Sequence, residues 1–169
     1  MRLPITLSEI GPRVSAGAFI LNSGLGKLHA DEATAAGLHG FASGSYPFLR
    51  NIPPKQFVTG LAFAELGIGG LLLAPVVPAA VAGAALTGFS GGLLGLYLRT
   101  PGMRKPGGLA PTQEGLTIAK DVWLLGIGVG LLTLGTIDRD TRRSERAAKA
   151  LSKATRRAKQ TARAAARGR

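Results

Sequence analysis

The chain has 169 residues, no cysteine and a formal net charge of +12 at pH 7. Without cysteine it cannot form disulfides, thiolate metal sites, iron–sulfur clusters or a cysteine nucleophile. Hydrophobic residues make up 46% of the chain, whereas residues 137–169 hold twelve Lys/Arg against three acidic residues. This division predicts an apolar membrane domain, residues 1–136, followed by a basic tail, residues 137–169.

The first predicted membrane span covers residues 14–30 and is the least apolar of four. A spanning helix needs about 20 mostly apolar residues. Asn22 interrupts this segment, and Lys27 lies near its end. The aliphatic part of a lysine side chain can stay in the membrane while its ammonium group reaches the interface. We therefore expect this segment to cross the membrane.

A polar loop follows the first span. Asp31 is a suitable N-cap for a short interfacial helix in the sequence DEATAAGLHGFASG. His29 and His39 lie ten residues apart without a nearby cysteine. That spacing is a weak metal-site pattern, so no metal site is expected.

Three further spans are predicted at residues 56–74, 78–98 and 116–135. The sequence PVVP separates the first two of these, which predicts a helical hairpin. The loop 99–115 is rich in proline and glycine and is expected to lack regular structure. The fold class is therefore all-α: an integral membrane antiparallel four-helix bundle with a basic, partly helical C-terminal tail.

Glycines are expected to mediate the helix packing, because small residues let membrane helices approach closely. Gly91 and Gly95 have the spacing GxxxG, as do Gly126 and Gly130, and a looser glycine series occurs in the second span. The predicted packing positions are Gly91, Gly95, Gly126, Gly130, Gly60, Gly67 and Gly70.

The basic tail also predicts the orientation. Lys and Arg accumulate on the cytoplasmic side of membrane proteins. We therefore expect a multi-pass membrane protein with both termini in the cytoplasm.

Glu65 is the most informative polar residue in the predicted spans. A carboxylate within a membrane costs at least ~2.5–3.5 kcal/mol unless a partner or water compensates it. Lys27 and Lys120 are the candidate partners at a similar depth. Two interpretations remain open. Glu65 forms a structural ion pair, or it belongs to a polar pocket for a quinone headgroup or a proton. The candidate lining residues are Asn22, Lys27, Glu65, Lys120 and Asp121, and only one of Lys120 and Asp121 is expected to face the other helices, because adjacent residues on a helix point about 100° apart.

The alanine-rich tail is expected to be helical at least near the membrane. Because the tail is tethered beside the bilayer, anionic lipids of the inner leaflet are its expected partner. Nucleic acid is the less favoured partner, since the tail lacks aromatic residues for stacking on bases. The candidate contact residues are Arg142, Arg143, Arg146, Lys149, Lys153, Arg156, Arg157, Lys159 and Arg163.

Three segments carry a resemblance to a known family: RVSAGAFILNSGLGKL (13–28), LAFAELGIGGLLL (61–73) and KDVWLLGIGVGLL (120–132). The chain resembles the DoxX-like family of small four-span bacterial membrane proteins, in particular its actinobacterial type. The resemblance implies a four-span fold in the bacterial inner membrane and marks Lys27 and Glu65.

It also implies an accessory subunit of a redox-linked membrane complex that handles quinones, thiols or oxidative stress. No motif in the sequence predicts autonomous catalysis. A small-molecule or proton-coupled carrier, acting alone or as a homo-oligomer, is an alternative. A membrane-tethered protein that organises nucleic acid or the envelope through its tail is another.

Overall fold

The computed structural model describes residues 5–167, except for the side chains at 136, 138–140, 142, 145–146 and 156–167. Apart from an isolated bridge between Arg104 and Pro111, the regular structure of the described residues is entirely helical. The elements are α1 (Leu7–Leu28), α2 (Glu32–Ser45), η1 (Pro47–Asn51), α3 (Pro54–Leu73), α4 (Ala79–Arg99), α5 (Leu116–Ala119) and α6 (Val122–Arg167).

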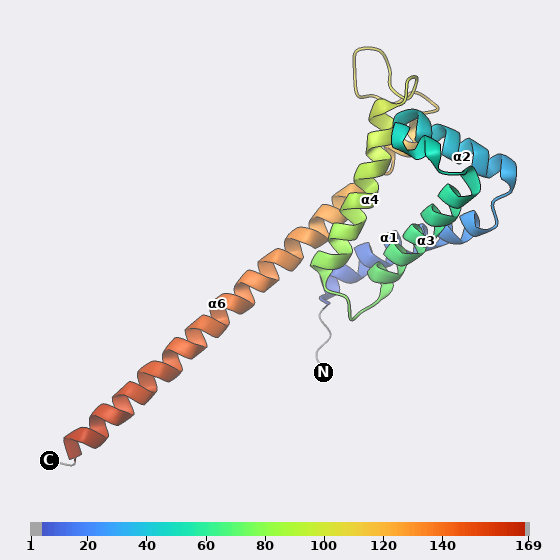
Figure 1. Cartoon of the computed structure of the whole chain (residues 1–169). Coiled ribbons are helices and arrows are strands. Elements are labelled where there is room, and N and C mark those ends of the chain that lie inside the picture. The colour runs from blue at the N-terminus through green and yellow to red at the C-terminus, as the bar shows by residue number, and fades with distance from the viewer. Residues whose placement is uncertain (1–4, 168–169) are drawn as a thin grey trace.

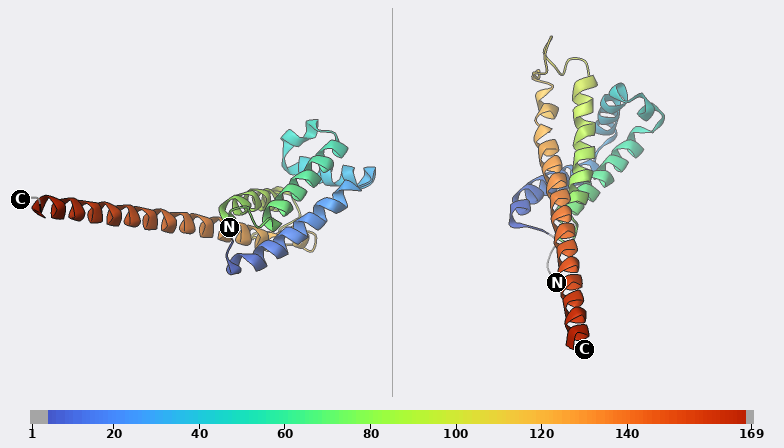
Figure 2. Two further views of the ribbon diagram at one scale, coloured as in Figure 1. Left: turned by 90° about the horizontal axis from the view of Figure 1, so that it is seen from below. Right: turned by 90° about the vertical axis from the view of Figure 1, so that its left-hand side faces the viewer.

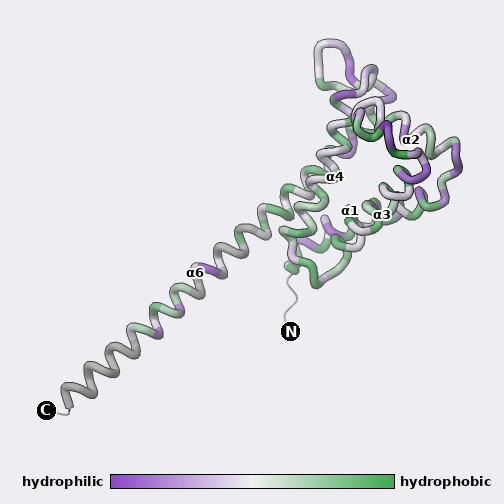
Figure 3. The backbone as a smooth tube through the Cα atoms, viewed as in Figure 1, coloured by the Kyte–Doolittle hydropathy of each residue, from purple (hydrophilic) through white to green (hydrophobic). Residues whose placement is uncertain are grey.

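Three helical segments are long and apolar enough to cross a membrane. They are Pro54–Leu73, Ala79–Arg99 and Leu116–Gly135, each with a mean hydropathy of 1.5. Apolar residues run along all three (Figure 3). Most residues in these segments are not buried by the rest of the chain, which suits contact with lipid tails. These segments correspond to three of the four predicted spans.

Helix α1 covers the remaining predicted span but begins earlier than expected. Its 22 residues would extend about 33 Å. It includes Glu9, Arg13 and Lys27, so its composition is more polar than that of the three segments above. Whether α1 crosses the membrane by itself therefore stays a prediction.

The long helices form two antiparallel pairs. α1 runs beside α3, and α4 runs beside the first part of α6 (Figures 1 and 2). A short turn joins α3 to α4, but the two helices diverge from it and share little contact. The predicted hairpin turn between α3 and α4 is therefore present, but the two helices pack little against each other, and a four-helix bundle is not confirmed.

Close approach of glycines explains this pairing. A Cβ atom at Gly17 or Gly24 of α1 would lie within 3.1 Å of α3, and one at Gly69 would press on α1. In the other pair, a Cβ at Gly83 of α4 would lie 2.7 Å from the Gly128 carbonyl oxygen of α6. Each pair thus places backbone against backbone, as is typical of membrane helices.

Most of the glycines predicted to pack do not do so. A Cβ would meet nothing within 4 Å at Gly91, Gly126, Gly130, Gly60, Gly67 or Gly70, and at Gly95 it would meet only the Tyr46 ring. GxxxG spacing shows that two glycines share a face, but it does not show which face meets a partner. The packed glycines Gly17/Gly24 and Gly128/Gly135 are seven residues apart, which also returns to one face after two turns.

We expect Gly83→Ala to lower the thermal unfolding temperature, because a methyl group there must push α4 and α6 apart. Overpacking of this kind costs about 1–3 kcal/mol. Gly91→Ala is the matched control on the same helix. Its added methyl meets open space, and alanine favours helix by about 1 kcal/mol over glycine. Thermal unfolding of both variants in nanodiscs tests this, and equal stability of the two would contradict the pairing.

Arg13 anchors the start of α1 to the end of α3, a role that the sequence did not reveal. Its side chain is 4% exposed and forms an ion pair with Glu9 at 3.4 Å. The last carbonyls of a helix lack partners within the helix. Arg13 supplies these partners and ties down the following turn. It donates hydrogen bonds of 2.9–3.1 Å to the carbonyl oxygens of Leu71, Leu72, Ala74 and Val77.

Helix α6 passes without a break through the predicted boundary between membrane domain and tail. Its 46 residues correspond to about 69 Å, and its C-terminal half projects away from the other helices (Figures 1 and 2). The predicted helical character of the tail therefore extends to residue 167. Of the predicted tail contacts, the side chains of Arg142, Arg146, Arg156, Arg157, Lys159 and Arg163 lie outside the described residues.

Candidate functional site

A cavity of about 600 Å³ lies between the two helix pairs. This volume is within the range of small-molecule sites, which are mostly apolar with a few polar groups. The polar part of the wall contains Ser23, Lys27, Glu65, Lys120 and Asp121. The apolar part comes from all the long helices and includes Phe19, Leu38, Phe41, Phe57, Leu61, Phe89, Leu93 and Leu124.

Helix α2 contributes part of the apolar wall and lies beside the ends of α3 and α4 (Figure 1). It begins at the predicted cap, where Asp31 accepts a 2.8 Å hydrogen bond from the Thr34 amide. Hydrogen bonds from the side chain and the backbone of Thr34 lower the pKa of Asp31. This carboxylate therefore keeps its capping charge at neutral pH.

Two contacts fix the far end of α2 against α4. The Tyr46 hydroxyl donates a 2.9 Å hydrogen bond to the Gly92 carbonyl, and the Ser45 and Thr100 hydroxyls lie 2.7 Å apart. The guanidinium of Arg99 lies 5.1 Å from the centre of the Tyr46 ring. These contacts hold Tyr46 at the cavity wall.

Glu65 has the lysine partner that its burial predicts. Lys27 Nζ lies 2.9 Å from Glu65 Oε2 and donates a second hydrogen bond of 2.7 Å to Ser23 Oγ. The Glu65 side chain is 5% exposed, and that of Lys27 is 19% exposed. Gly24 brings α1 close to this point, since a Cβ there would lie 3.1 Å from Glu65 Cβ. The third N–H of Lys27 has no partner among the described residues.

Lys120 and Asp121 lie where the predicted span 116–135 is interrupted. α5 ends at Ala119 and α6 begins at Val122. Across this junction the amides of Asp121 and Leu124 bond to carbonyls three residues earlier, instead of four. Such a tightened turn within a helix often marks a hinge or a strained sequence. The irregular backbone here borders the cavity, as expected for a membrane segment.

The interruption directs Asp121 inward. Its Oδ1 atom is buried and accepts no hydrogen bond from any described group. The cavity therefore offers an unused hydrogen-bond donor on Lys27 and an unused acceptor on Asp121.

The remaining predicted residues behave differently. Asn22 is exposed and does not line the cavity, because it lies about 100° around α1 from Ser23, which takes its place. Only one of Lys120 and Asp121 was expected to face the helices. Both border the cavity, although Lys120 is largely exposed and Asp121 is the deeper group.

Most of the apolar wall could not be recognised from the sequence. Leu38 and Phe41 come from α2, which was expected only as an interfacial helix. Gly88 and Gly92 border the cavity from α4 and leave room inside it. Their spacing of four residues was a signal, but it indicates space for a ligand here and not helix packing.

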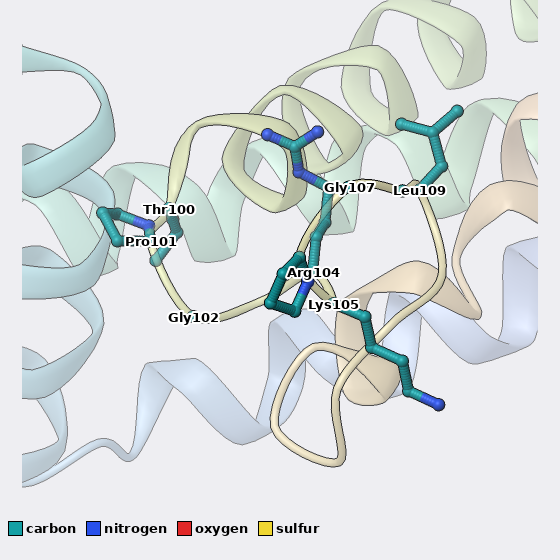
Figure 4. Close-up of a pocket in the computed structure, with 9 residues that line it drawn as sticks. Thr100, Pro101, Gly102, Arg104, Lys105, Gly107 and Leu109 are labelled. Atoms are coloured by element: carbon teal, nitrogen blue, oxygen red, sulfur yellow. The ribbon is translucent and has the colours of Figure 1, made fainter.

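A second cavity, of about 530 Å³, lies within the loop between α4 and α5 (Figure 4). Gly102 and Gly107 have φ values of 84° and 76°, which favour glycine at these turns. Arg104 and Lys105 extend in different directions from the loop. These charges do not converge on a common ligand position.

The two histidines hold no metal site with other residues that the structure describes. His29 Nδ1 lies 3.2 Å from the Leu25 carbonyl oxygen, and His39 Nε2 lies 3.0 Å from that of Leu49. His39 also packs edge-on against Phe57, at the border of the cavity.

No protein-family model matches the chain, and neither curated proteins nor solved structures give a significant match. The class of protein therefore rests on the structure alone. Over residues 5–167 the protein is helical, with three helices that can span a membrane and a cavity with a polar wall between its helix pairs.

Proposed function

We propose that this integral membrane protein binds an amphipathic small molecule of the quinone type in the cavity between its helix pairs. The observation that carries this proposal is the combination of an apolar wall with one donor and one acceptor that are not used by the protein. The Lys27 ammonium can donate to a ligand carbonyl. Asp121 Oδ1 can accept from a ligand hydroxyl.

The same chemistry suits both redox forms of a quinone. A quinone carbonyl needs a donor, whereas the hydroxyl of a quinol needs an acceptor. Charged groups in a desolvated site form stronger hydrogen bonds than neutral groups do. Glu65 supports this site by compensating the charge of Lys27 and by fixing the direction of its side chain.

Within this proposal the chain is an accessory subunit of a redox-linked membrane complex in the bacterial inner membrane. Its resemblance to the DoxX-like family supports such a role. The antiparallel contact between α1 and α3 supports four spans, since it places α1 at the depth of an apolar helix. Four spans and a basic C-terminal tail would leave both termini in the cytoplasm.

The alternative of an autonomous carrier is less favoured. A carrier must open its site to each side of the membrane in turn. At the end where α3 passes into α4, Arg13 bonds to four carbonyl groups of the connecting segment. These buried contacts stabilise that end of the protein in one arrangement, which does not favour opening there.

Trp123 makes the proposal testable, because it is the single tryptophan of the chain. Its ring lies 5.6 Å from that of Phe19, which borders the cavity. We expect menadione to quench Trp123 fluorescence saturably in nanodiscs. Asp121→Asn keeps the shape but weakens acceptance of a quinol hydroxyl, so it should weaken menadiol binding at least ten-fold, which is about 1.4 kcal/mol.

Glu114→Gln, at an exposed position in the loop before α5, is the matched control and should leave both affinities unchanged. Linear quenching that never saturates, in the protein and in both variants, would contradict a quinone site.

A further inference from the structure

The basic residues in the C-terminal half of α6 follow a regular order. Positions 142, 149, 156 and 163 recur every seven residues, and so do positions 146, 153 and 167, with Gln160 between the last two. Because a helix has 3.6 residues per turn, both series fall on one side of α6. Alanine and leucine at positions 147, 151, 154, 158 and 165 fall on the opposite side. We call the two basic series together the basic stripe.

The basic stripe lies on a helix that continues straight from the membrane segment. α6 shows no break at Gly135, where it packs closely against Ala80 (Figures 1 and 2). Lys153 lies 18 residues beyond Gly135, which is about 27 Å along the helix. Lys149 and Lys153 are both exposed there.

This distance argues against the lipid headgroups as the main partner of the stripe. Attraction to an anionic leaflet falls off within a Debye length, about 8 Å at physiological ionic strength. Most of the stripe lies well beyond that distance if the helix keeps its course out of the membrane. The straight helix therefore favours a different partner from the one that composition predicted.

A second copy of the tail is also a poor partner. Residues 146–169 contain nine Lys/Arg and no acidic residue, so two such helices repel each other. The alanine side offers little apolar area to offset that repulsion. The partner whose charge is complementary to the stripe is an extended polyanion.

We infer that the basic stripe of α6 binds duplex DNA through its phosphates and without reading the base sequence. From position 142 to 167 the stripe extends about 38 Å, close to one turn of B-DNA at 34–36 Å. An α-helix fits the major groove, which is about 12 Å wide. Apart from Gln160 the stripe consists of Arg and Lys, and neutralisation of phosphates is the contact that such a row of charges can make on a duplex of any sequence. This inference is independent of the proposed ligand site.

The test uses the full-length protein in nanodiscs of uncharged phosphatidylcholine and a fluorescent 30-base-pair duplex. One variant removes four charges from the stripe: R142Q, K149Q, R156Q and R163Q. The matched control removes four charges from its flanks: R139Q, R143Q, R157Q and K159Q. Both variants have the same net charge, and their helix content is compared by circular dichroism.

Seven phosphate contacts give a slope of log K against log salt of about −6, and three remaining contacts give about −3. We expect the stripe variant to show the lower slope and at least a ten-fold loss of affinity at 100 mM salt. The flank control should stay within about three-fold of the natural protein.

Three outcomes would overturn the inference. Equal losses of duplex affinity in both variants would show that binding depends on net charge and not on one face of the helix. Absence of duplex binding would exclude the partner. If nanodiscs containing phosphatidylglycerol bound the stripe more tightly than the duplex does and displaced the duplex from it, the stripe would be assigned to lipid.

Discussion

A Lys27→Met variant is expected to lose about 3–5 kcal/mol of folding stability. Methionine keeps most of the length of the side chain but leaves the Glu65 carboxylate buried without its ion partner. Removing one partner of a buried ion pair has a cost of this size, because the remaining charge is no longer compensated. Glu65→Leu should have a similar effect, since it leaves the Lys27 ammonium unpaired. Thermal unfolding in nanodiscs measures both losses.

The double variant Lys27→Met/Glu65→Leu separates structure from function. Replacing a whole buried ion pair by apolar residues is often neutral for stability. We therefore expect it to be more stable than either single variant and to retain the fold. It should nevertheless lose saturable quenching of Trp123 by menadione, because the ligand carbonyl no longer has its donor. Lys105→Met, on an exposed loop, is the matched control for the loss of a lysine.

The opposite result would be equally informative. Menadione affinity that survives in a folded double variant would show that the pair only fixes helix packing. The cavity would then need a different ligand, with Asp121 as its polar contact.

The second large effect is expected at Arg13. Arg13→Met should cost at least about 3 kcal/mol, because four backbone carbonyl groups and Glu9 lose a common donor. Each buried polar group left without a partner costs about 1–3 kcal/mol. Arg13→Lys should recover only part of this loss. A lysine ammonium has three donors on one atom and cannot reach oxygens that the planar guanidinium spans.

Arg50→Met, at an exposed position on η1, is the control for removing an arginine elsewhere. It should unfold within a degree or two of the natural protein, since surface substitutions away from special features change stability by less than about 0.5 kcal/mol. If Arg13→Lys matched the natural protein, the charge and not the geometry of Arg13 would hold α1 to α3.

The amino-acid sequence by itself determined the apolar helices and the need for a partner at Glu65. Length and hydropathy are local properties, so the spans at 56–74, 78–98 and 116–135 could be recognised without knowing their neighbours. The pairing of Glu65 followed from the cost of burying a charge. Lys27 and Lys120 both remained candidates for the partner of Glu65, because the depth of a residue in the membrane does not determine the direction in which its side chain points. The helical course of the tail followed from its alanine and arginine content.

Only the tertiary structure decided which faces meet. Arg13 contacts carbonyl groups 58–64 positions later in the chain, and no local pattern reports a contact of that kind. The glycine spacing named shared faces, but the direction of those faces depends on how α1 meets α3 and how α4 meets α6. Asn22 and Ser23 differ by one position, yet only Ser23 lines the cavity, since that choice depends on the rotation of α1. Helix rotation is set by contacts between elements distant in sequence. The sequence could therefore indicate the region of the site, but only the tertiary structure decided which side chains line it.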